Sequence, residues 1–314
     1  MKHKTFVTLP VTESCRQKML EMKDSFDFCF TSASEITEED LQAAEIIIGN
    51  LPCDTIRKAT SLKWLQLNSA GFAEYLESGI LPDGCILTNA AGAYGPAVSE
   101  HMLAMIFAMS KKLHLYRDSQ NRQCWEDHGT VRPLHGQTAL IIGMGDIGSK
   151  IAQVLHALGN HVIGIKRNIH NCPDYADRLY TMEQLNEVLP LADLVIVCLP
   201  ASPENYHFMG EHQFQLMKNT ALFFNGGRGS LVDTDALLKA VQEKQIAGAG
   251  LEVIEPEPLP SDHPIWKEPD ILLTPHCSGG FHMPETLERI CGIVLQNLAN
   301  YKEGLPLINQ CNTF

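Results

Sequence analysis

The amino-acid sequence predicts an α/β protein of two domains, each built around a parallel sheet, and three observations support this prediction. The chain has 314 residues, a length that suits two domains of ordinary size. Short apolar runs alternate along it with amphipathic stretches, and such alternation is typical of parallel strands covered by helices. Hydrophobic residues make up 45% of the chain and charged residues 19%, which is the composition of a folded protein and not of a disordered one.

Two series of strands are predicted, with helices between them. The first series covers 4–8, 45–49, 63–67 and 84–88, and the second covers 138–142, 161–165, 193–198, 220–224, 247–251 and 271–274. Helical periodicity is clearest at 147–159, 233–244 and 285–301. The apolar stretch 95–122 between the two series predicts one long helix. We place a first domain at 1–100 and a second at 101–283, and we expect the tail 284–314 to return to the first.

Charge and cysteine usage argue against several classes of protein. The net charge is −13, from 24 Lys and Arg against 37 Asp and Glu, so phosphates of nucleic acid or anionic lipid would be repelled. The sequence has no run of about 18 apolar residues and no visible signal peptide. The ten cysteines form no CxxC pair, and no HExxH motif occurs. We expect a cytoplasmic protein with reduced thiols and with no nucleic-acid, membrane or metal partner.

A glycine-rich segment, GMGDIG at 143–148, has the context of a dinucleotide-binding turn. The apolar run 139–142 precedes it and predicts a strand, the amphipathic stretch 147–158 follows as a helix, and 161–165 predicts a second strand. A GxGxxG pattern alone is weak, because glycines occur in many turns. This strand–turn–helix–strand setting is the one that the dinucleotide fingerprint requires.

Each glycine of this segment has a physical role. Gly143 permits the tight turn, Gly145 lets a pyrophosphate approach the backbone, and Gly148 lets the helix pack closely on the strand. The N-terminus of the helix offers free N–H groups and a partial positive charge to the phosphates. We therefore predict that the cofactor contacts Gly143, Met144, Gly145, Asp146, Ile147 and Gly148.

The end of the second strand should select the cofactor. An acid about 20 residues into such a unit would bind the ribose 2′-hydroxyl of NAD. Lys166 and Arg167 stand there instead, and a cationic pair suits the 2′-phosphate of NADP. The sequence therefore predicts NADP(H) over NAD(H). The alternative is that both cations are simply solvated at the surface.

Three polar side chains after the dinucleotide unit are candidates for catalysis. Arg228 and His276 each come just past an apolar strand, and Glu257 lies in the proline-flanked turn EPEPLP. Ligands of open α/β sheets bind beyond the carboxyl ends of the strands, where these residues would lie. Taken singly, each has a structural explanation, as a turn cap, a solvated acid or a packed histidine.

Six segments, by their order and spacing, resemble the D-isomer-specific 2-hydroxyacid dehydrogenases over nearly the whole chain. They are 89–101 (NAAGAYGPAVSEH), 143–148 (GMGDIG), 199–204 (LPASPE), 225–233 (NGGRGSLVD), 255–259 (EPEPL) and 274–276 (TPH). The resemblance implies two Rossmann-like or flavodoxin-like domains with parallel sheets, an active site in the cleft between them, and a homodimer. It also implies that Leu199 and Pro200 border the cofactor.

The resemblance implies a role for each of the three candidates. Arg228 would hold the substrate carboxylate or polarise the carbonyl. His276 would act as general acid in reduction and as base in oxidation, and Glu257 would hydrogen-bond the imidazole and favour its protonated form. Such a set suits carbonyl reduction, because the oxygen gains negative charge and needs a proton and a cation.

The same resemblance assigns a substrate-carboxylate loop and exposes one departure. Segment 67–72 (LNSAGF) matches the loop, so Ser69 and the N–H groups of Ala70 and Gly71 would bind substrate, unless the segment is an ordinary turn. Members of the family usually carry an Asp five residues before the catalytic Glu, where it contacts the nicotinamide carboxamide. This chain has Glu252 there, which we expect to make the same contact with a shifted cofactor pose.

The main hypothesis is a reductase of small 2-oxoacids such as glyoxylate or hydroxypyruvate, giving D-2-hydroxyacids, and two alternatives stay open. A 3-phosphoglycerate dehydrogenase would want cations near its substrate loop, and segment 68–84 contains no Lys or Arg. A non-enzymatic dinucleotide sensor on the same scaffold is the second alternative, since fold alone does not fix function. The Lys166–Arg167 pair points to the glyoxylate and hydroxypyruvate reductase branch of the family.

Overall fold

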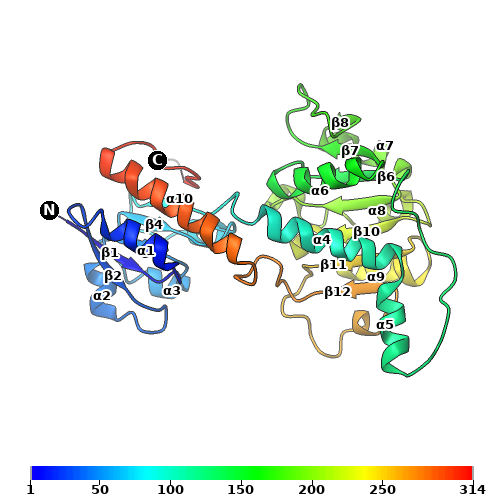
Figure 1. The fold of residues 1–314 in the computed structure, drawn as a ribbon, viewed down its shortest axis with the longest axis horizontal. Coiled ribbons are helices and arrows are strands. Elements are labelled where there is room, and N and C mark those ends of the chain that lie inside the picture. The colour runs from blue at the N-terminus through cyan, green and yellow to red at the C-terminus, as the bar shows by residue number, and fades with distance from the viewer. Residues whose placement is uncertain (1, 313–314) are drawn as a thin grey trace. The chain divides into compact units, whose positions relative to one another are not determined.

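The computed structural model describes residues 2–312, which divide into two compact units (Figure 1). One unit is formed by the chain up to Tyr94 together with the chain from Gly280 onward, and the other by Gly95–Gly279. Each contains one sheet whose strands are all parallel, so the predicted α/β class with two parallel sheets is confirmed. The observed boundaries fall slightly before the positions 101 and 284 expected from the sequence.

The first unit holds a five-stranded sheet in the order β2-β1-β3-β4-β5. Its strands are β1 (His3–Val7), β2 (Phe26–Phe30), β3 (Ile46–Ile48), β4 (Trp64–Gln66) and β5 (Ile86–Thr88). Its helices are α1 (Glu13–Leu20), α2 (Glu38–Ala43), α3 (Cys53–Ile56), a short 3-10 helix (Ala73–Leu76) and α10 (Pro284–Glu303).

Both faces of this sheet are buried. Ile46 and Ile48 of β3 belong to a core shared with α1 and α10, whereas Ile47 between them belongs to a second core on the opposite face. Successive side chains of a strand point to opposite faces, so a continuous isoleucine run is what a strand buried on both sides requires.

A buried polar network ties the C-terminal helix α10 to the first unit. Asn297 is fully buried; its Nδ2 donates to Gln66 Oε1 (2.8 Å) and to the carbonyl of Ile308 (3.1 Å). Its Oδ1 accepts from the Ile308 N–H (2.8 Å). Thr88 also donates to Gln66 Oε1, and Trp64 Nε1 donates to Thr88. The bonds satisfy buried polar groups, which is why the tail is held here.

The second unit holds a seven-stranded sheet in the order β12-β11-β10-β9-β6-β7-β8. Its strands are β6 (Thr138–Ile142), β7 (His161–Ile165), β8 (Arg178–Tyr180), β9 (Leu194–Val197), β10 (Leu222–Asn225), β11 (Gly248–Leu251) and β12 (Ile271–Leu273). Its α-helices are α4 (Gly95–Ser110), α5 (Leu113–Asn121), α6 (Asp146–Ala157), α7 (Leu185–Val188), α8 (Glu211–Leu216) and α9 (Thr234–Gln242). Short 3-10 helices cover Met182–Gln184, Leu189–Leu191, Pro203–Asn205, Gly229–Leu231 and Pro264–Lys267.

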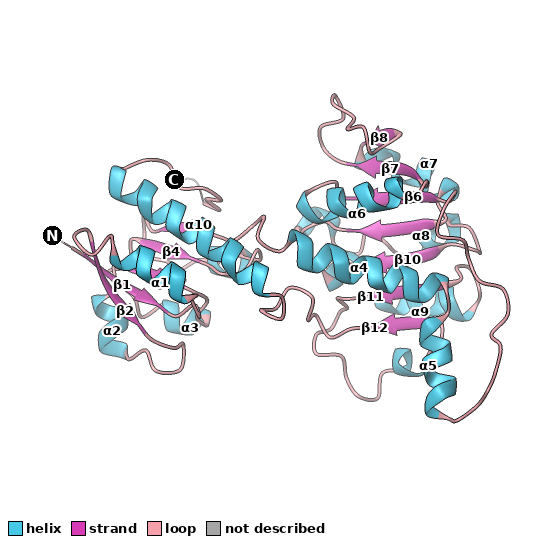
Figure 2. Ribbon diagram, in the orientation of Figure 1, coloured by secondary structure: helices cyan, strands magenta, loops and turns pink. Residues whose placement is uncertain are grey.

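Helices cover both faces of this sheet, as Figure 2 shows. Residues of α7, α8 and α9 share one core with the strands, and α4 packs against α6 and contacts β10 and β11 on the other face. The strand order reverses between β6 and β9, because β7 lies on one side of β6 and β9 on the other. Such a switch point is where ligands of open α/β sheets bind.

The predicted long helix at 95–122 is wrong in one respect, since the structure has two helices there. α4 ends at Ser110 and α5 begins at Leu113. Lys112 between them has a left-handed backbone, with φ 58°, and its Nζ donates to the carbonyl of His128. A non-glycine residue in this conformation ends a regular helix.

The sequence prediction also missed two strands, β2 and β8. Both are at the edge of a sheet, and β8 is only three residues long. An edge strand is covered on fewer sides, so its sequence need not form the continuous apolar run that marks the central strands. Strands 138–142 and 161–165 were predicted with the observed bounds.

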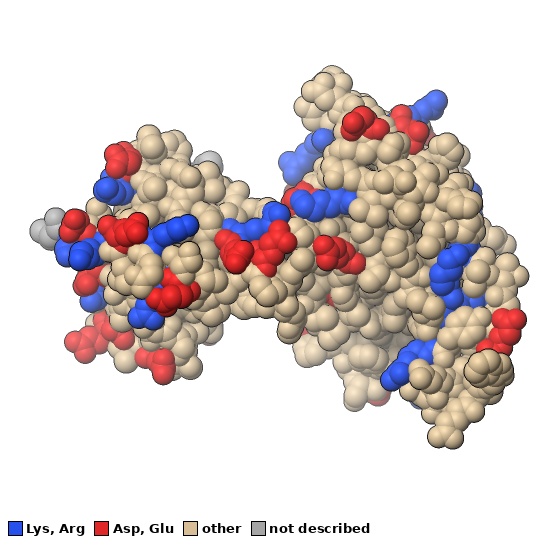
Figure 3. All heavy atoms as spheres, in the orientation of Figure 1, with Lys and Arg blue, Asp and Glu red and all other residues tan. Residues whose placement is uncertain are grey.

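The cysteines are unpaired, and the charged side chains on one face of the surface are mixed in sign. All ten cysteines are free thiols. On the face drawn in Figure 3, acidic and basic side chains are interspersed. Within residues 2–312, no helix combines the length and the apolar character needed to span a membrane.

Replacement of Asn297 tests the network that holds α10. Asn297→Leu removes three hydrogen bonds, two of them from a fully buried side chain to Gln66 and Ile308, and leaves the Ile308 N–H without its protein partner, so we expect a loss of about 3 kcal/mol in the free energy of unfolding, measured by urea titration. Gln296→Leu, at the neighbouring exposed position, is the control and should change that free energy by less than about 0.5 kcal/mol. Equal stabilities for the two variants would contradict the role given to this network.

Candidate active site

The glycine turn after β6 has the geometry that the sequence predicted. Gly143 has φ 103°, and a Cβ there would lie 2.8 Å from the carbonyl oxygen of Cys198, so only glycine fits. A Cβ on Gly148 would lie 2.1 Å from the carbonyl oxygen of Gly143, which lets α6 pack closely on the turn. Gly145, the residue that caps α6, has open space instead. Free N–H groups of the first helical turn face this space, and the arrangement fits a pyrophosphate.

The other residues of the predicted turn divide into packed and exposed ones. Met144 is buried and packs against Gly164 of β7. Asp146 is exposed and pairs with Lys150, and Ile147 is half-buried. The turn therefore offers its backbone, and not its side chains, to a ligand.

A cavity of about 620 Å³ lies beside the end of β7. Both predicted cations line it, Lys166 half-buried and Arg167 exposed, and neither forms an ion pair within residues 2–312. The sequence analysis missed several of its other residues. It is lined as well by Ile165, Thr181, Met182, Glu183, Leu199, Pro200, Ser202, Glu204 and Asn205.

Two acids of this cavity carry negative charge close to the cations. A hydrogen bond with Thr181 lowers the pKa of Glu183, and one with Ser202 lowers the pKa of Glu204. Ser202 and Glu204 belong to a segment quoted above for its family resemblance. That segment was therefore the signal that could have indicated them as site residues.

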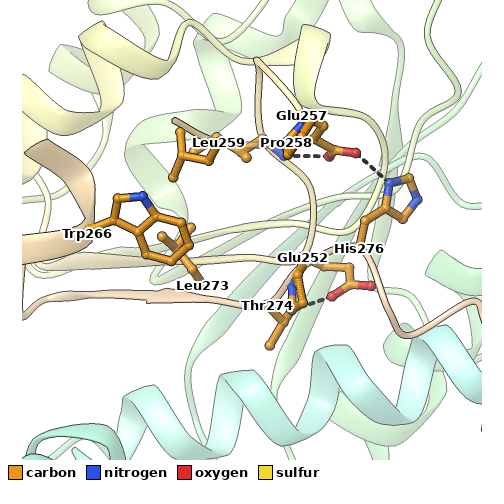
Figure 4. Close-up of a pocket in the computed structure, with 10 residues that line it drawn as sticks. Glu252, Glu257, Pro258, Leu259, Trp266, Leu273, Thr274 and His276 are labelled. Carbon is orange, nitrogen blue, oxygen red and sulfur yellow. Dashed lines mark hydrogen bonds and ion pairs between the residues drawn. The ribbon is translucent and has the colours of Figure 1, made fainter. Parts of the chain in front are cut away.

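His276 and Glu257 meet at the carboxyl edge of the second sheet (Figure 4). His276 follows β12, and its Nδ1 lies 2.8 Å from Glu257 Oε2. The other carboxylate oxygen of Glu257 accepts from the backbone N–H of Ile254 (3.0 Å), which fixes the acid. The side chains of the two are 46% and 36% exposed, so the pair is open to a ligand.

Arg228 lies on a neighbouring loop that packs against the Glu257 loop. It follows β10, which is separated from β12 by β11 alone. A Cβ on the next residue, Gly229, would lie 2.0 Å from the carbonyl oxygen of Ile254, so the two loops touch through their backbones. The half-buried guanidinium donates to the carbonyl of Gly227 (2.8 Å) and forms no ion pair in the described part of the chain. It keeps donors free for an anionic or carbonyl ligand.

Glu252 directs its carboxylate into the protein. The residue follows β11 and is 2% exposed. Its Oε1 accepts from the Ser278 N–H (2.6 Å), and its Oε2 accepts from the Thr274 hydroxyl and lies 3.2 Å from His101 Nε2. Burial by itself would raise the pKa of Glu252, but the bonds with His101, Ser278 and Thr274 outweigh it and lower the pKa to about 2.

An apolar cavity of about 580 Å³ adjoins Glu257 and His276. Its apolar walls are formed by Ile254, Pro258, Leu259, Leu273 and Trp266, and Glu252, Thr274 and Pro275 also line it. Trp266 is 53% exposed, and its Nε1 donates to the carbonyl of Pro260 (2.9 Å). In Figure 4 the cavity lies on the Glu257 side of the imidazole.

The predicted carboxylate loop belongs to the first unit. Ser69 donates from Oγ to the carbonyl of Gly71 (2.7 Å), and Asn89 donates to the carbonyl of Ala70 (2.8 Å). The N–H groups of Ala70 and Gly71 donate to no protein acceptor within residues 2–312. They are therefore free for an anionic ligand.

The fold and the glycine turn define a dinucleotide-binding α/β protein with a histidine–carboxylate pair at the ligand edge of its sheet. Within residues 2–312, no group of three or more His, Cys, Asp or Glu side chains could hold a metal ion. A histidine whose Nδ1 is held by a carboxylate has its other ring nitrogen available to exchange a proton.

Comparison with known proteins identifies the family. The model of the D-isomer specific 2-hydroxyacid dehydrogenase NAD binding domain matches residues 103–278, and the chain belongs to this family of oxidoreductases. The resemblance drawn from the six segments is thereby confirmed. The chain is 30% identical to a glyoxylate reductase of Aeropyrum pernix, over 82% of this chain and 79% of the relative.

Two further relatives extend over the whole chain. A glyoxylate reductase of Korarchaeum cryptofilum is 29% identical over 99% of this chain and 97% of its own length. A crystal structure of a D-isomer specific 2-hydroxyacid dehydrogenase family protein from Aeromonas salmonicida is 27% identical, covers 99% of both chains and superposes with a TM-score of 0.86.

The lowered pKa of Glu252 predicts a pH dependence of stability. A folded-state pKa of about 2, against an ordinary 4.5, stabilises the fold above pH 4.5 by about 3 kcal/mol, and this is lost as the pH falls from 4.5 toward 2. In urea unfolding, Glu252→Gln should be less stable than the wild type at pH 7, and the gap should narrow below pH 4.5.

Glu243→Gln, at an exposed position, is the control for this titration, and its free energy of unfolding should equal that of the wild type at every pH. If the difference in free energy of unfolding between the wild type and Glu252→Gln stayed the same from pH 7 to pH 3, the assignment of the carboxylate as ionised and hydrogen-bonded would be wrong.

Proposed function

We propose that the protein reduces small 2-oxoacids, of the size of glyoxylate or hydroxypyruvate, to D-2-hydroxyacids, with NADPH preferred over NADH. The observation that carries the proposal is the 2.8 Å pair of His276 and Glu257 at the carboxyl edge of a sheet that also bears the glycine turn. The two relatives named as glyoxylate reductases support the substrate class.

His276 is the proton donor in this proposal. When bound, the reduced nicotinamide supplies the hydride that the substrate carbonyl carbon gains. The carbonyl oxygen then carries negative charge and takes a proton from Nε2 of His276. Because Glu257 holds Nδ1, its carboxylate fixes the ring orientation and stabilises the positive charge of the protonated imidazole. In the oxidative direction the same nitrogen accepts the proton.

Arg228 supplies the cation that this oxygen or the substrate carboxylate needs. Its guanidinium has no acidic partner in the described chain, and its loop packs on that of Glu257. A guanidinium presents a fixed fork of donors that matches a carboxylate. Ala70 and Gly71 of the first unit are assigned to the substrate carboxylate as well, since their N–H groups are free.

The cofactor is assigned to the glycine turn and to the cavity at the end of β7. The backbone of 143–148 would hold the pyrophosphate, Leu199 and Pro200 would line the adenosine side, and Lys166 and Arg167 would hold a 2′-phosphate. The preference for NADPH depends on these two cations outweighing Glu183 and Glu204, which line the same cavity. The two cations directly follow β7, the strand after the glycine turn and its helix, where the ribose is expected.

The proposed reaction is tested by a cofactor-absorbance assay with a panel of 2-oxoacids and with 3-phosphoglycerate in the reverse direction. We expect turnover of small unphosphorylated 2-oxoacids, and His276→Gln should lower kcat by about 100-fold or more while the Kd for NADPH stays within twofold. His212→Gln, at an exposed position, is the control and should keep full activity. No turnover with any member of the panel would overturn the proposal and favour a dinucleotide sensor.

The cofactor preference is tested by replacing both cations with serine. Loss of one charge-assisted phosphate contact costs about 1.5–3 kcal/mol, so the Lys166→Ser, Arg167→Ser double variant should raise the KM for NADPH by at least about 10-fold and leave that for NADH nearly unchanged. Arg57 and Lys58, two exposed neighbours in the first unit, offer a control: their replacement by serine makes the same change of charge and should leave the KM for both cofactors unchanged. A wild-type enzyme that already prefers NADH would contradict the assignment.

A further inference from the structure

The catalytic histidine has an unusual backbone conformation. His276 lies in the left-handed region with φ 49°. A residue with a Cβ is strained in this conformation, and it keeps the conformation only where its surroundings fix it. Whatever fixes residues 274–278 therefore also fixes the direction of the imidazole.

Glu252 binds this turn on both sides of His276. Its carboxylate accepts from the Thr274 hydroxyl, two residues before the histidine, and from the Ser278 N–H at 2.6 Å, two residues after it. The carbonyl of Glu252 accepts from the N–H of His276 itself, at 3.0 Å. One buried residue thus holds both ends and the centre of the left-handed turn.

His101 of α4 also contacts both Thr274 and the carboxylate of Glu252. Its Nε2 lies 3.0 Å from Thr274 Oγ1 and 3.2 Å from Glu252 Oε2, and its side chain is 26% exposed. A donor at this position offsets the cost of burying the carboxylate. All these residues belong to the same compact unit, so the network is internal to it.

The length of the glutamate matters for this arrangement. The carboxylate must reach Ser278 with one oxygen and both Thr274 and His101 with the other, while its backbone stays in register at the end of β11. An aspartate is one methylene shorter. From the same backbone position we expect it to lose at least one of these three partners.

The geometry points to Glu252 and His101 as a positioning pair that holds His276 in its left-handed turn, in place of a contact between Glu252 and the nicotinamide carboxamide. This inference rests on the proposed function, because it concerns the acid–base residue of that reaction. Neither residue is assigned a contact with substrate or cofactor. Their effect on the reaction is transmitted through the 274–278 turn.

The experiment compares Glu252→Asp, His101→Leu and His101→Gln with the wild type and with Glu100→Gln, an exposed neighbour on α4. Glu252→Asp and His101→Leu should lower kcat about 10- to 100-fold and leave the Kd for NADPH within twofold, since a small misplacement of the acid has effects of this size. His101→Gln restores an N–H donor near Nε2 and should recover most of the activity. Glu100→Gln should leave it unchanged.

A second cofactor separates the two roles of Glu252. The 3-acetylpyridine analogue of the cofactor lacks the carboxamide N–H₂. If Glu252 held this group, Glu252→Asp would lower kcat with the natural cofactor but not with the analogue. A positioning role predicts the same fractional loss with both cofactors. Wild-type kcat in Glu252→Asp, or a tenfold higher Kd for NADPH with unchanged kcat, would overturn the inference.

Crystal structures of the cofactor-free proteins provide a readout that does not depend on turnover. The wild type should show His276 left-handed and bonded to Glu257, and Glu252→Asp and His101→Leu should show residue 276 outside the left-handed region or with the Nδ1–Oε2 distance lengthened. An unmoved His276 in both variants would overturn the inference. If no 2-oxoacid is reduced but His276 moves as expected, then the proposed function fails while the positioning role stands.

Discussion

The parallel register of the seven-stranded sheet is the constraint on which the candidate site depends. Because all its strands run the same way, their carboxyl ends meet at one edge, and the loops that follow β6, β7, β9, β10, β11 and β12 gather there. These loops carry the glycine turn, the Lys166–Arg167 pair, Arg228, Glu257 and His276. Residues more than a hundred positions apart come together because of strand direction, without any long-range ion pair having to attract them.

Electrostatics acts locally in this protein, and the net charge of −13 says little about the site. The interior carries one buried carboxylate at the ligand edge, Glu252, and its three donors outweigh the cost of taking the charge out of water. Lys166 and Arg167 line the β7 cavity, and neither forms an ion pair in the part of the chain that the structure describes. An anionic ligand would therefore meet these particular groups, and acidic side chains farther away than a screening length of about 8–10 Å would have little influence on it.

How far the sequence predicted the structure depended on how strongly each position is constrained. Central strands such as 138–142 are buried on both faces, so their continuous apolar runs made them predictable from the sequence. The edge strands β2 and β8 and the left-handed break at Lys112 have no such pattern. The glycine turn was predictable because steric contact leaves glycine as the only residue that fits at positions 143 and 148. The direction of the Glu252 side chain was not, because it is decided by Thr274, Ser278 and His101, which the topology brings from two other segments.

The left-handed His276 shows why the site needs partners that no local motif describes. A glycine would adopt this backbone without strain but has no imidazole, so the position must carry a strained histidine. The strain is small beside the hydrogen bonds that hold the turn from Glu252 and beside the bond from Glu257 to the ring. Backbone and ring are thus fixed by different carboxylates, one buried and one exposed. In the proposed reaction, the buried acid would set where the histidine lies, and the exposed acid would hold Nδ1 and leave Nε2 to exchange a proton.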